Sequence, residues 1–211
     1  MKKGHFISFE GPDGSGKTTI SSLVSQALKK RGFDVVYTRE PGGIRISEMI
    51  RDLILDPKNV EMDAKTEALL YAAGRRQHLV EKIIPNIDAG RIVLSDRFVD
   101  SSLAYQGVGR EIGIKEVFDI NMFAIEGYMP ELTIYLDIDP QVGLDRIGSR
   151  DFKDRLDQED ISFHERVSQG YELVKEKYQE RLKIFDGNRS IEDLTSEITE
   201  YIIEWITAHE A

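Results

Sequence analysis

Cysteine is absent from this chain of 211 residues, which excludes disulfide bonds, thiolate metal sites and thiol nucleophiles. A protein without cysteine fits a reducing compartment, and we therefore expect it in the cytoplasm. Long apolar runs are also missing, because the longest, residues 68–73, is far shorter than the roughly 20 residues that a membrane span needs. The N-terminus reaches Glu10 and Gly11 before any apolar signal-peptide core, so we expect neither a signal peptide nor a membrane partner.

Basic residues are in the minority: 28 lysines and arginines stand against 38 aspartates and glutamates, for a formal net charge of −10. Proteins that follow a nucleic-acid backbone usually present a broad basic face, so we expect no nucleic-acid partner. The arginines stand singly beside glycines, prolines and apolar runs, as in residues 39–43, 72–77, 95–98 and 148–155. Isolated cations on an acidic protein indicate a small anionic ligand. The four histidines lack the spacing of metal ligands.

Internal repeats, low-complexity tracts and flexible linkers are missing too, so residues 1–211 are interpreted as one domain. Short apolar runs without clean alternation predict strands at residues 5–9, 33–38, 92–95, 132–137 and 182–185. Helical spacing of apolar residues predicts helices at residues 18–31, 98–107, 115–126, 141–147, 161–182 and 191–207. A further long helix is expected to begin after Asp63, to kink or end at Pro85 and to close at Gly90. This alternation predicts an α/β fold with a mostly parallel central sheet.

Residues 11–18 read GPDGSGKT and match the phosphate-binding pattern G-x-x-x-x-G-K-[ST] between a predicted strand and a predicted amphipathic helix. Glycines let successive backbone N–H groups point at phosphate oxygens, and the next helix adds its positive N-terminal end. Lys17 is expected to reach the β- and γ-phosphates, and Thr18 to hold Mg²⁺. A glycine-rich turn that binds nothing is the alternative. The context favours ATP binding by the whole loop, which comprises Gly11, Pro12, Asp13, Gly14, Ser15, Gly16, Lys17 and Thr18.

The phosphate-binding loop does not tell what happens to a bound triphosphate. The tetrapeptide Asn-Lys-x-Asp, with which GTPase switches read guanine, is absent, and a motor or large ATPase normally needs a longer chain. What remains is chiefly the class of small-molecule and nucleotide kinases. Two alternatives stay open: a kinase of the same fold with another acceptor, and an ATP-binding switch or scaffold with slow turnover.

Five further segments occur in a recognisable order: TREPGG (38–43), TEALLYAAGRRQH (66–78), IVLSDRF (92–98), SSLAYQG (101–107) and DRLDQED (154–160). Together with the phosphate-binding loop they resemble the thymidylate kinase family over nearly the whole chain. The resemblance implies a P-loop nucleoside monophosphate kinase fold, with a parallel five-stranded sheet flanked by helices and usually a homodimer. It also implies phosphorylation of dTMP to dTDP with ATP and Mg²⁺, in the biosynthesis of dTTP.

Candidate residues for the base and the sugar follow from this resemblance. Tyr71 and Arg75 are four residues apart and therefore share a helix face, and the resemblance assigns them to thymine; a core tyrosine with a surface arginine is the plain alternative. Ser102 and Gln106 resemble the residues that read the base edge, with an ordinary polar helix start as the alternative. Tyr105 matches the residue that crowds the sugar 2′ position and so disfavours ribonucleotides.

Cations for the acceptor phosphate are expected where strands end, because ligands of open α/β sheets collect there. Arg39 and Arg97 match the two phosphate clamps of the family, and a planar guanidinium can bind two phosphate oxygens at once. Arg51 is a further candidate for the same pocket. Asp13 matches the acid that accepts a hydrogen bond from the 3′-hydroxyl of dTMP. Asp96 resembles an acid that holds Mg²⁺ through water, with helix capping as the competing explanation.

The acceptor needs no general base, because the second pKa of a phosphate monoester is about 6 and the group is already ionised near neutral pH. Catalysis then depends on positioning and on cations, for which Lys17 and Arg97 are candidates. Some family members carry an arginine in the loop itself, where this chain has Gly14. In this respect the chain resembles the bacterial subclass, in which a mobile lid supplies the basic residues.

The lid is expected at about residues 148–158, a polar stretch with several cations. Arg150 and Arg155 are the candidate catalytic arginines, with Lys153 in reserve, and Arg146 is a candidate contact to ATP. A solvated loop is the alternative for each of them.

The chain also departs from the family pattern beside the acceptor pocket. Residues 44–46 follow REPGG where the family usually has Thr-Pro, Phe98 replaces a common tyrosine, and Tyr71 replaces a more frequent phenylalanine. Phosphotransfer is therefore a firmer expectation than the choice of monophosphate. The apolar residues 117–125 fit either a core helix or a dimer face.

Overall fold

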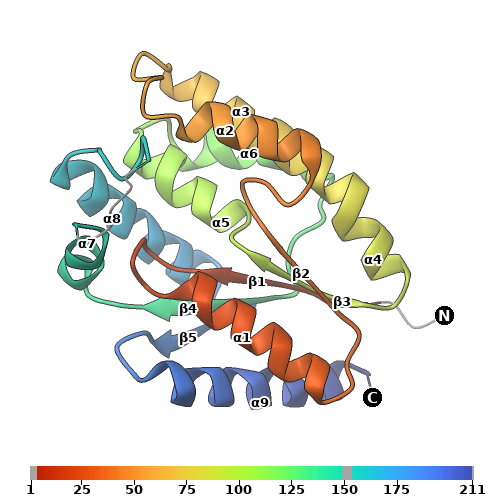
Figure 1. The fold of residues 1–211 in the computed structure, drawn as a ribbon. Coiled ribbons are helices and arrows are strands. Elements are labelled where there is room, and N and C mark those ends of the chain that lie inside the picture. Colours follow the sequence, from red (N-terminus) through yellow and green to blue (C-terminus); the bar gives the residue numbers. More distant parts are fainter. Residues whose placement is uncertain (1–3, 149–153, 211) are drawn as a thin grey trace.

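The computed structural model describes residues 4–148 and 154–210, and these form one five-stranded sheet with helices around it (Figure 1). The strands are β1 (Phe6–Glu10), β2 (Val35–Arg39), β3 (Ile92–Asp96), β4 (Leu132–Asp137) and β5 (Leu182–Asp186). They lie in the order β2-β3-β1-β4-β5, and all neighbouring pairs are parallel. Every residue of β1 and β3 is buried, which explains why these strands lack alternation in the sequence. The predicted parallel five-stranded sheet is confirmed.

One face of the sheet is covered by α1 (Lys17–Lys30) and α9 (Ile191–Glu210), which pack side by side (Figure 1). Each helix buries one apolar stripe with residues spaced four apart. The stripes consist of Ile20, Val24 and Leu28 in α1 and of Leu194, Ile198, Ile202 and Ile206 in α9. They meet Ile7 and Phe9 of β1, and this core holds α1, and with it the end of the phosphate-binding loop, against the sheet.

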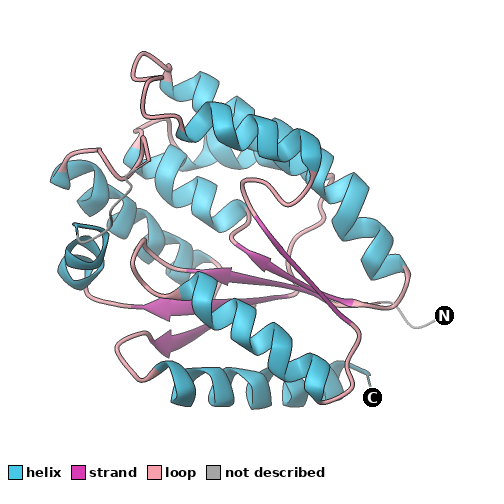
Figure 2. Cartoon of the chain, viewed as in Figure 1, coloured by secondary structure: helices cyan, strands magenta, loops and turns pink. Residues whose placement is uncertain are grey.

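The other helices of the described chain lie on the opposite face or at its edge (Figure 2). They are α2 (Arg45–Leu55), α3 (Ala64–His78), α4 (Ile84–Asp88), α5 (Val99–Ser102), α6 (Ile114–Ile125), α7 (Pro140–Gly148) and α8 (Ile161–Lys177), with the π-helical segments η1 (Leu79–Ile83) and η2 (Leu103–Gly109). A second core joins Phe6 and Val93 of the sheet to Leu79, Ile83 and Leu103. Over residues 4–148 and 154–210, no helix is both long and apolar enough to cross a membrane.

The long helix that begins after Asp63 continues beyond the proline expected to kink or end it. The Asp63 carboxylate caps its first turn by accepting hydrogen bonds from the N–H groups of Lys65 and Thr66. α3, η1 and α4 then follow one another without a break to Asp88. Pro85 has no N–H to donate, and the wider π-helical turn of η1 stands directly before the segment that contains it.

Two helices differ from the sequence-based expectation. The sequence analysis does not predict α2, although Ile46, Met49, Ile50 and Leu53 stand at helical spacing within it. The expected helix at residues 161–182 ends at Lys177, because Leu182 already belongs to β5, where it pairs with Thr133 of β4. α2 matters for the site, since it packs against α3 and carries Arg51.

Candidate active site

The phosphate-binding loop connects the end of β1 to the start of α1, at the edge of the sheet where the strands end. Gly11 has a φ of +146° and Gly14 a φ of +80°, a region that other residues rarely adopt. A Cβ at Gly11 would lie 2.6 Å from the carbonyl oxygen of Leu136, and one at Gly14 would lie 2.5 Å from that of Gly143. Glycine at both positions therefore keeps the loop in its tight curl.

Lys17 and Ser15 place buried polar groups in this loop. The ammonium group of Lys17 donates to the carbonyl oxygen of Pro12 at 3.1 Å, and the side chain is only about 6% exposed. Burial, and then the charge of Arg97, lower the pKa of Lys17 to about 8. The hydroxyl of Ser15 is buried and has no hydrogen-bond partner among the residues that the structure describes. An anionic ligand in the loop would give the Ser15 hydroxyl a partner and Lys17 a further anion.

The side chains of Thr18 and Asp96 meet across the loop and the end of β3. The Thr18 hydroxyl donates to Oδ2 of Asp96 at 2.6 Å, while the other carboxylate oxygen is buried without a hydrogen-bond partner in the described chain. Both residues offer oxygen donors only, which is the set that Mg²⁺ prefers, usually together with several waters. Apart from the undescribed residues, no cluster of three or more acidic, histidine or cysteine side chains could hold a metal alone. These two residues therefore fit a magnesium ion that binds together with phosphates.

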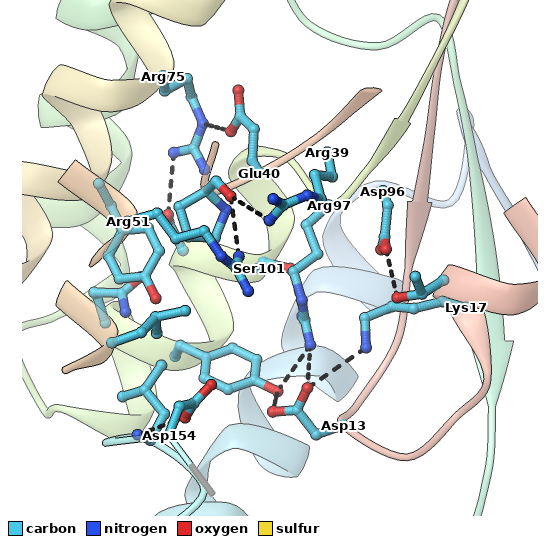
Figure 3. A pocket seen from close by; sticks show the side chains of 18 of the residues that line it. Asp13, Lys17, Arg39, Glu40, Arg51, Arg75, Asp96, Arg97, Ser101 and Asp154 are labelled. Atoms are coloured by element: carbon cyan, nitrogen blue, oxygen red, sulfur yellow. Dashed lines mark hydrogen bonds and ion pairs between the residues drawn. The ribbon is translucent and has the colours of Figure 1, made fainter. Parts of the chain in front are cut away.

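Arg97 follows directly after β3 and carries its backbone at a φ of +72°, which is uncommon for a residue other than glycine. This conformation aims the guanidinium back over the loop, where it donates to Oδ1 of Asp13 at 2.5 Å (Figure 3). It also donates to the hydroxyls of Ser101 at 2.8 Å and Tyr171 at 3.0 Å. Asp13 accepts a further hydrogen bond, from the hydroxyl of Tyr105 at 2.6 Å. The Asp13 carboxylate, which the sequence places beside a polyphosphate, is thus held by the cation of Arg97 and the hydroxyl of Tyr105.

Behind Arg97 lies a buried carboxylate that the sequence analysis does not identify. Glu10 at the end of β1 accepts hydrogen bonds from the Phe98 N–H at 2.7 Å and from the Ser101 hydroxyl at 2.5 Å. Burial, reinforced by the charge of Asp100, raises the pKa of Glu10 from 4.5 to about 7. An acidic residue at the end of an otherwise apolar strand is the sequence signal that could have revealed it.

A cavity of about 470 Å³ begins at the loop and extends between α2, α3 and η2 (Figure 3). It contains all nine side chains that the sequence analysis assigns to the acceptor. These are Asp13, Arg39, Arg51, Tyr71, Arg75, Arg97, Ser102, Tyr105 and Gln106. Its walls also include residues that were not predicted, namely Pro41, Leu55, Ser101, Asp154, Leu156 and Asp157. The structure thus brings residues from both halves of the sequence to one site.

Arg39 and Arg51 reach this cavity from β2 and α2. The Arg39 guanidinium forms an ion pair with Glu48 at 2.9 Å, and Arg51 donates to the carbonyl oxygen of Pro41 at 3.0 Å. In Figure 3 the two arginines come from opposite sides and meet between Arg75 and Arg97, where both donate to the carbonyl oxygen of Pro41. Together with Arg97, these two residues bring three guanidinium groups to one end of the acceptor space.

Arg75 lies at the far end of the cavity and is almost fully buried. It donates to Glu40 at 2.7 Å, to the Ser102 hydroxyl at 3.0 Å, to the carbonyl oxygen of Phe98 at 3.0 Å and to the Asn121 side chain. The alternative of a surface arginine is therefore wrong, because a buried network orients this group. Asn121 and Glu40 were not predicted, although Glu40 stands in the REPGG segment.

His78 completes the support beneath Arg75. Its ring joins Oε1 of Glu40 at 2.9 Å to the Thr38 hydroxyl at 2.7 Å, and the side chain is fully buried. Burial alone would raise the pKa of Glu40, but the charge of Arg75 and the contacts to His78 outweigh it and lower that pKa. Glu40 is therefore an anion that fixes the guanidinium from behind.

Of the four cations expected in or beside the lid, the structure describes Arg146 and Arg155. Arg146 donates to the carbonyl oxygen of Gly14 at 2.8 Å and so already lies at the phosphate-binding loop. Arg155, expected as a lid arginine in a polar loop, is instead buried: it pairs with Glu67 at 2.5 Å and donates to the carbonyl oxygen of Ile54 at 2.7 Å. The expected exposed setting of Arg155 in a polar loop is therefore wrong, because Glu67 and the Ile54 carbonyl hold its guanidinium beside the acceptor cavity. Arg150 and Lys153 lie outside the described residues.

The fold and this geometry define a class of protein: a P-loop phosphotransferase that holds a nucleoside triphosphate and a second anion in one continuous site. The family model for thymidylate kinase matches residues 9–198, and the chain belongs to the thymidylate kinase family. It is accordingly a nucleoside monophosphate kinase, of the family that phosphorylates dTMP to dTDP.

Individual relatives agree with the family match. A thymidylate kinase of Geobacillus thermodenitrificans is 57% identical over 196 residues, which cover 92% of this chain and 87% of that protein. One of Clostridium novyi is 53% identical over 204 residues, 96% of this chain and 100% of the relative. The crystal structure of a thymidylate kinase from Ehrlichia chaffeensis superposes with a TM-score of 0.77 at 32% identity, and the match covers 95% of this chain and 98% of that one.

Proposed function

We propose that this kinase transfers the γ-phosphoryl group of ATP to the phosphate of dTMP, with Mg²⁺ as its cofactor, and releases ADP and dTDP. One observation carries the proposal: a single cavity joins Lys17, Thr18 and Asp96 at one end to Tyr71, Arg75 and Gln106 at the other. Donor and acceptor can then react without leaving the protein, and the family match names the acceptor.

The donor triphosphate binds in the phosphate-binding loop. Backbone N–H groups of residues 11–18 and the buried Ser15 hydroxyl hold its oxygens, and Lys17 contacts the β- and γ-phosphates. Thr18 and Asp96 would hold Mg²⁺, which would supply positive charge to offset that of the phosphates. Arg146, already at Gly14, binds the donor at the rim of the loop.

The acceptor phosphate binds between Arg39, Arg97 and Arg51. Because this phosphate is ionised near neutral pH, its oxygen attacks the γ-phosphorus without a general base. The work of the protein is to bring two polyanions together and to keep them in line, for which the guanidinium groups of Arg39 and Arg97 are suited. Arg97 has the larger part, because its hydrogen bonds tie the acceptor site to Asp13 in the donor loop.

The thymine ring binds at the far end of the cavity. Tyr71 provides an aromatic face, and Arg75, Ser102 and Gln106 provide polar contacts to the edge of the base. Tyr105 stands beside the sugar and excludes a 2′-hydroxyl, while Asp13 accepts a hydrogen bond from the 3′-hydroxyl. For the transferring phosphoryl group itself, we propose Arg150 as the further arginine, in the lid that the sequence predicts at about residues 148–158.

A panel of monophosphates tests this function. Release of ADP from Mg-ATP is measured with dTMP, dUMP, dCMP, dGMP and dAMP, each with and without excess EDTA. Selective stimulation by dTMP that disappears on chelation supports the proposal. Stimulation by another nucleotide alone would give the enzyme a different acceptor, and no stimulation by any of them would leave an ATP-binding protein with slow turnover.

We propose further that the protein acts as a cytoplasmic homodimer. The absence of cysteine supports the compartment. The dimer is supported by large apolar side chains left exposed on α2, α3 and α6, namely Met49, Leu69 and Phe123, the last of them 89% exposed. Light scattering at assay concentration should give twice the monomer mass for the natural chain, and Phe123→Glu should shift it toward the monomer mass.

A further inference from the structure

Glu67 lies one turn before Tyr71 on α3, behind the wall of the acceptor cavity, and its side chain is fully buried. Its carboxylate accepts hydrogen bonds from Gln106 at 2.9 Å and from Arg155 at 2.5 Å, and it forms an ion pair with Arg110 at 3.0 Å. Glu67 is not part of the cavity surface, whereas Gln106 is. A buried anion therefore touches a residue of the acceptor site from the side that no ligand reaches.

The contact to Glu67 determines which end of the Gln106 carboxamide faces the ligand. A carboxylate can only accept hydrogen bonds, so the carboxamide must turn its NH₂ group toward Glu67. The carbonyl oxygen of Gln106 is then left on the other side of the amide, as an acceptor for the ligand. A reversed amide would set two acceptors against each other inside the protein, which is costly where no water can separate them.

Arg75 presents the complementary group. A guanidinium has five N–H bonds, and four of them go to Glu40, Ser102, Asn121 and the carbonyl oxygen of Phe98. Within the described chain, one N–H of Nη2 is left, on a residue that belongs to the cavity surface. In thymine and uracil, the N3–H can donate to the carbonyl oxygen of Gln106, and the neighbouring C4 carbonyl can accept from Arg75. This arrangement mismatches cytosine, which has an unprotonated N3 and a C4 amine.

We infer that Glu67 is a positioning residue that selects thymine and uracil over cytosine, because its buried carboxylate locks the carboxamide of Gln106 with the oxygen toward the base. The inference rests on the proposed function and assigns the origin of its base preference. Glu67 does not touch the substrate. It acts through Gln106, and its two arginine partners keep it charged and in place in the protein interior.

The test is Glu67→Gln, assayed with dTMP, dCMP and dUMP under identical conditions. A neutral carboxamide at position 67 can donate as well as accept, so the Gln106 amide is free to adopt both orientations. We expect the ratio of kcat/KM for dTMP to that for dCMP to fall at least about tenfold. The ratio for dTMP to dUMP should stay within about twofold, because these two bases share the N3–H and C4 carbonyl edge. A general loosening of the pocket would change both ratios.

Two further variants separate the role of Glu67 from its ion pairs. Arg110→Met removes one ion-pair partner of Glu67 and leaves the contact to Gln106, so the dTMP to dCMP ratio should match that of the natural protein. In a Gln106→Ala background, Glu67→Gln should produce no additional change in that ratio. If Glu67→Gln fails to fold, the double variant with Arg155→Met is used, because in the described chain Arg155 pairs with Glu67 alone whereas Arg110 keeps its ion pair with Glu159. The same ratios are measured on it.

The outcomes distinguish this inference from the proposed function. An unchanged dTMP to dCMP ratio in folded Glu67→Gln would overturn the role of Glu67 and leave the kinase activity intact. A further fall of the ratio in the Gln106→Ala background would show that Glu67 acts by another route, and would also overturn it. If the natural protein does not phosphorylate dTMP at all, the proposed function fails, and the inference fails with it.

Discussion

The guanidinium of Arg97 lies 2.5 Å from the carboxylate of Asp13, so a residue directly after β3 and a residue within the phosphate-binding loop form one partly buried ion pair. The hydroxyl of Tyr105 adds a second hydrogen bond to the same carboxylate at 2.6 Å. Through these contacts the acceptor site and the donor loop share a wall. Asp13 of the loop positions the side chains of Arg97 and Tyr105, which a substrate in the acceptor site would contact.

Replacement of Asp13 should therefore affect the acceptor more than the donor. In Asp13→Ala, Arg97 and Tyr105 lose their shared acceptor and the 3′-hydroxyl of dTMP loses its partner, whereas the N–H groups of the loop remain. We expect kcat/KM for dTMP to fall by at least about tenfold while the dissociation constant of ATP changes by less than about threefold. Steady-state kinetics and calorimetry measure the two quantities, and equal losses in both would remove the assignment of Asp13 to dTMP.

Nucleotide binding should take up protons at mildly alkaline pH. Burial, and then the charge of Arg97, lower the pKa of Lys17 from 10.5 to about 8, so above that pH a growing share of the free protein has a neutral Lys17. Bound phosphates favour the charged form and raise this pKa again, and affinity for ATP should decline as the pH rises through about 8. Calorimetry at about pH 8.5 in buffers of different ionisation enthalpy measures the uptake.

A matched control for Lys17 is Lys17→Arg, because a guanidinium stays protonated throughout this range. Its ATP binding, even if weaker, should proceed without proton uptake. Equal uptake by the variant and by the natural protein would point to another titrating group.

The buried Glu10 should make the folded protein less stable as the pH rises. Its pKa in the folded protein is about 7 and lies above the unfolded value of about 4.5, so the folded state holds a proton that the unfolded state releases. Stability from this group is fully present below about pH 4.5 and is lost as the pH rises through about 7. The difference amounts to roughly 3 kcal/mol at most.

Glu10→Gln isolates this contribution, because its side chain stays neutral at every pH. The free energy of unfolding of the natural protein minus that of the variant should fall between about pH 4.5 and 7.5, as followed by urea denaturation in that range. A difference that stays flat, or that rises with pH, would show that Glu10 ionises freely in the folded protein.

The aromatic ring of Tyr105, rather than its hydroxyl, should exclude ribonucleotides. In Tyr105→Phe the ring stays beside Arg97, from which it is separated by 5.0 Å, and the preference for dTMP over its ribonucleotide counterpart should persist. Loss of the hydrogen bond to Asp13 should lower kcat by several-fold in that variant, as expected for a hydrogen bond worth about 1 kcal/mol. Tyr105→Leu removes the ring, and the preference should fall by about tenfold in kcat/KM.

Arg150 and Arg155 should affect different kinetic constants. Arg150→Ala is expected to lower kcat by at least about tenfold with the affinity for dTMP preserved, because we assign this residue to the transferring phosphoryl group. Arg155→Ala should chiefly raise the KM for dTMP, since its partners are Glu67 and the carbonyl oxygen of Ile54 beside the acceptor cavity. The same loss of kcat in both variants would show that Arg155, like Arg150, acts on the transferring phosphoryl group.

Much of the site can be predicted from the sequence because its elements are local. The phosphate-binding loop follows from one octapeptide, and Tyr71 with Arg75 and Ser102 with Gln106 each lie one helical turn apart. The structure places all four of these side chains in the cavity. The ion pair of Arg155 could not be predicted in this way, because its partner Glu67 is 88 residues away along the chain.

The sequence by itself determined the order of the strands and of the helices other than α2, and the conformation of the phosphate-binding loop, because apolar periodicity and glycine act over a few neighbouring residues. Tertiary structure alone decided which charges meet in the interior. Glu10, Glu40 and Glu67 look like ordinary surface acids in the sequence, and each is buried against a partner from another element. Burying a carboxylate is costly unless donors converge on it, and only the packing of distant elements brings those donors together.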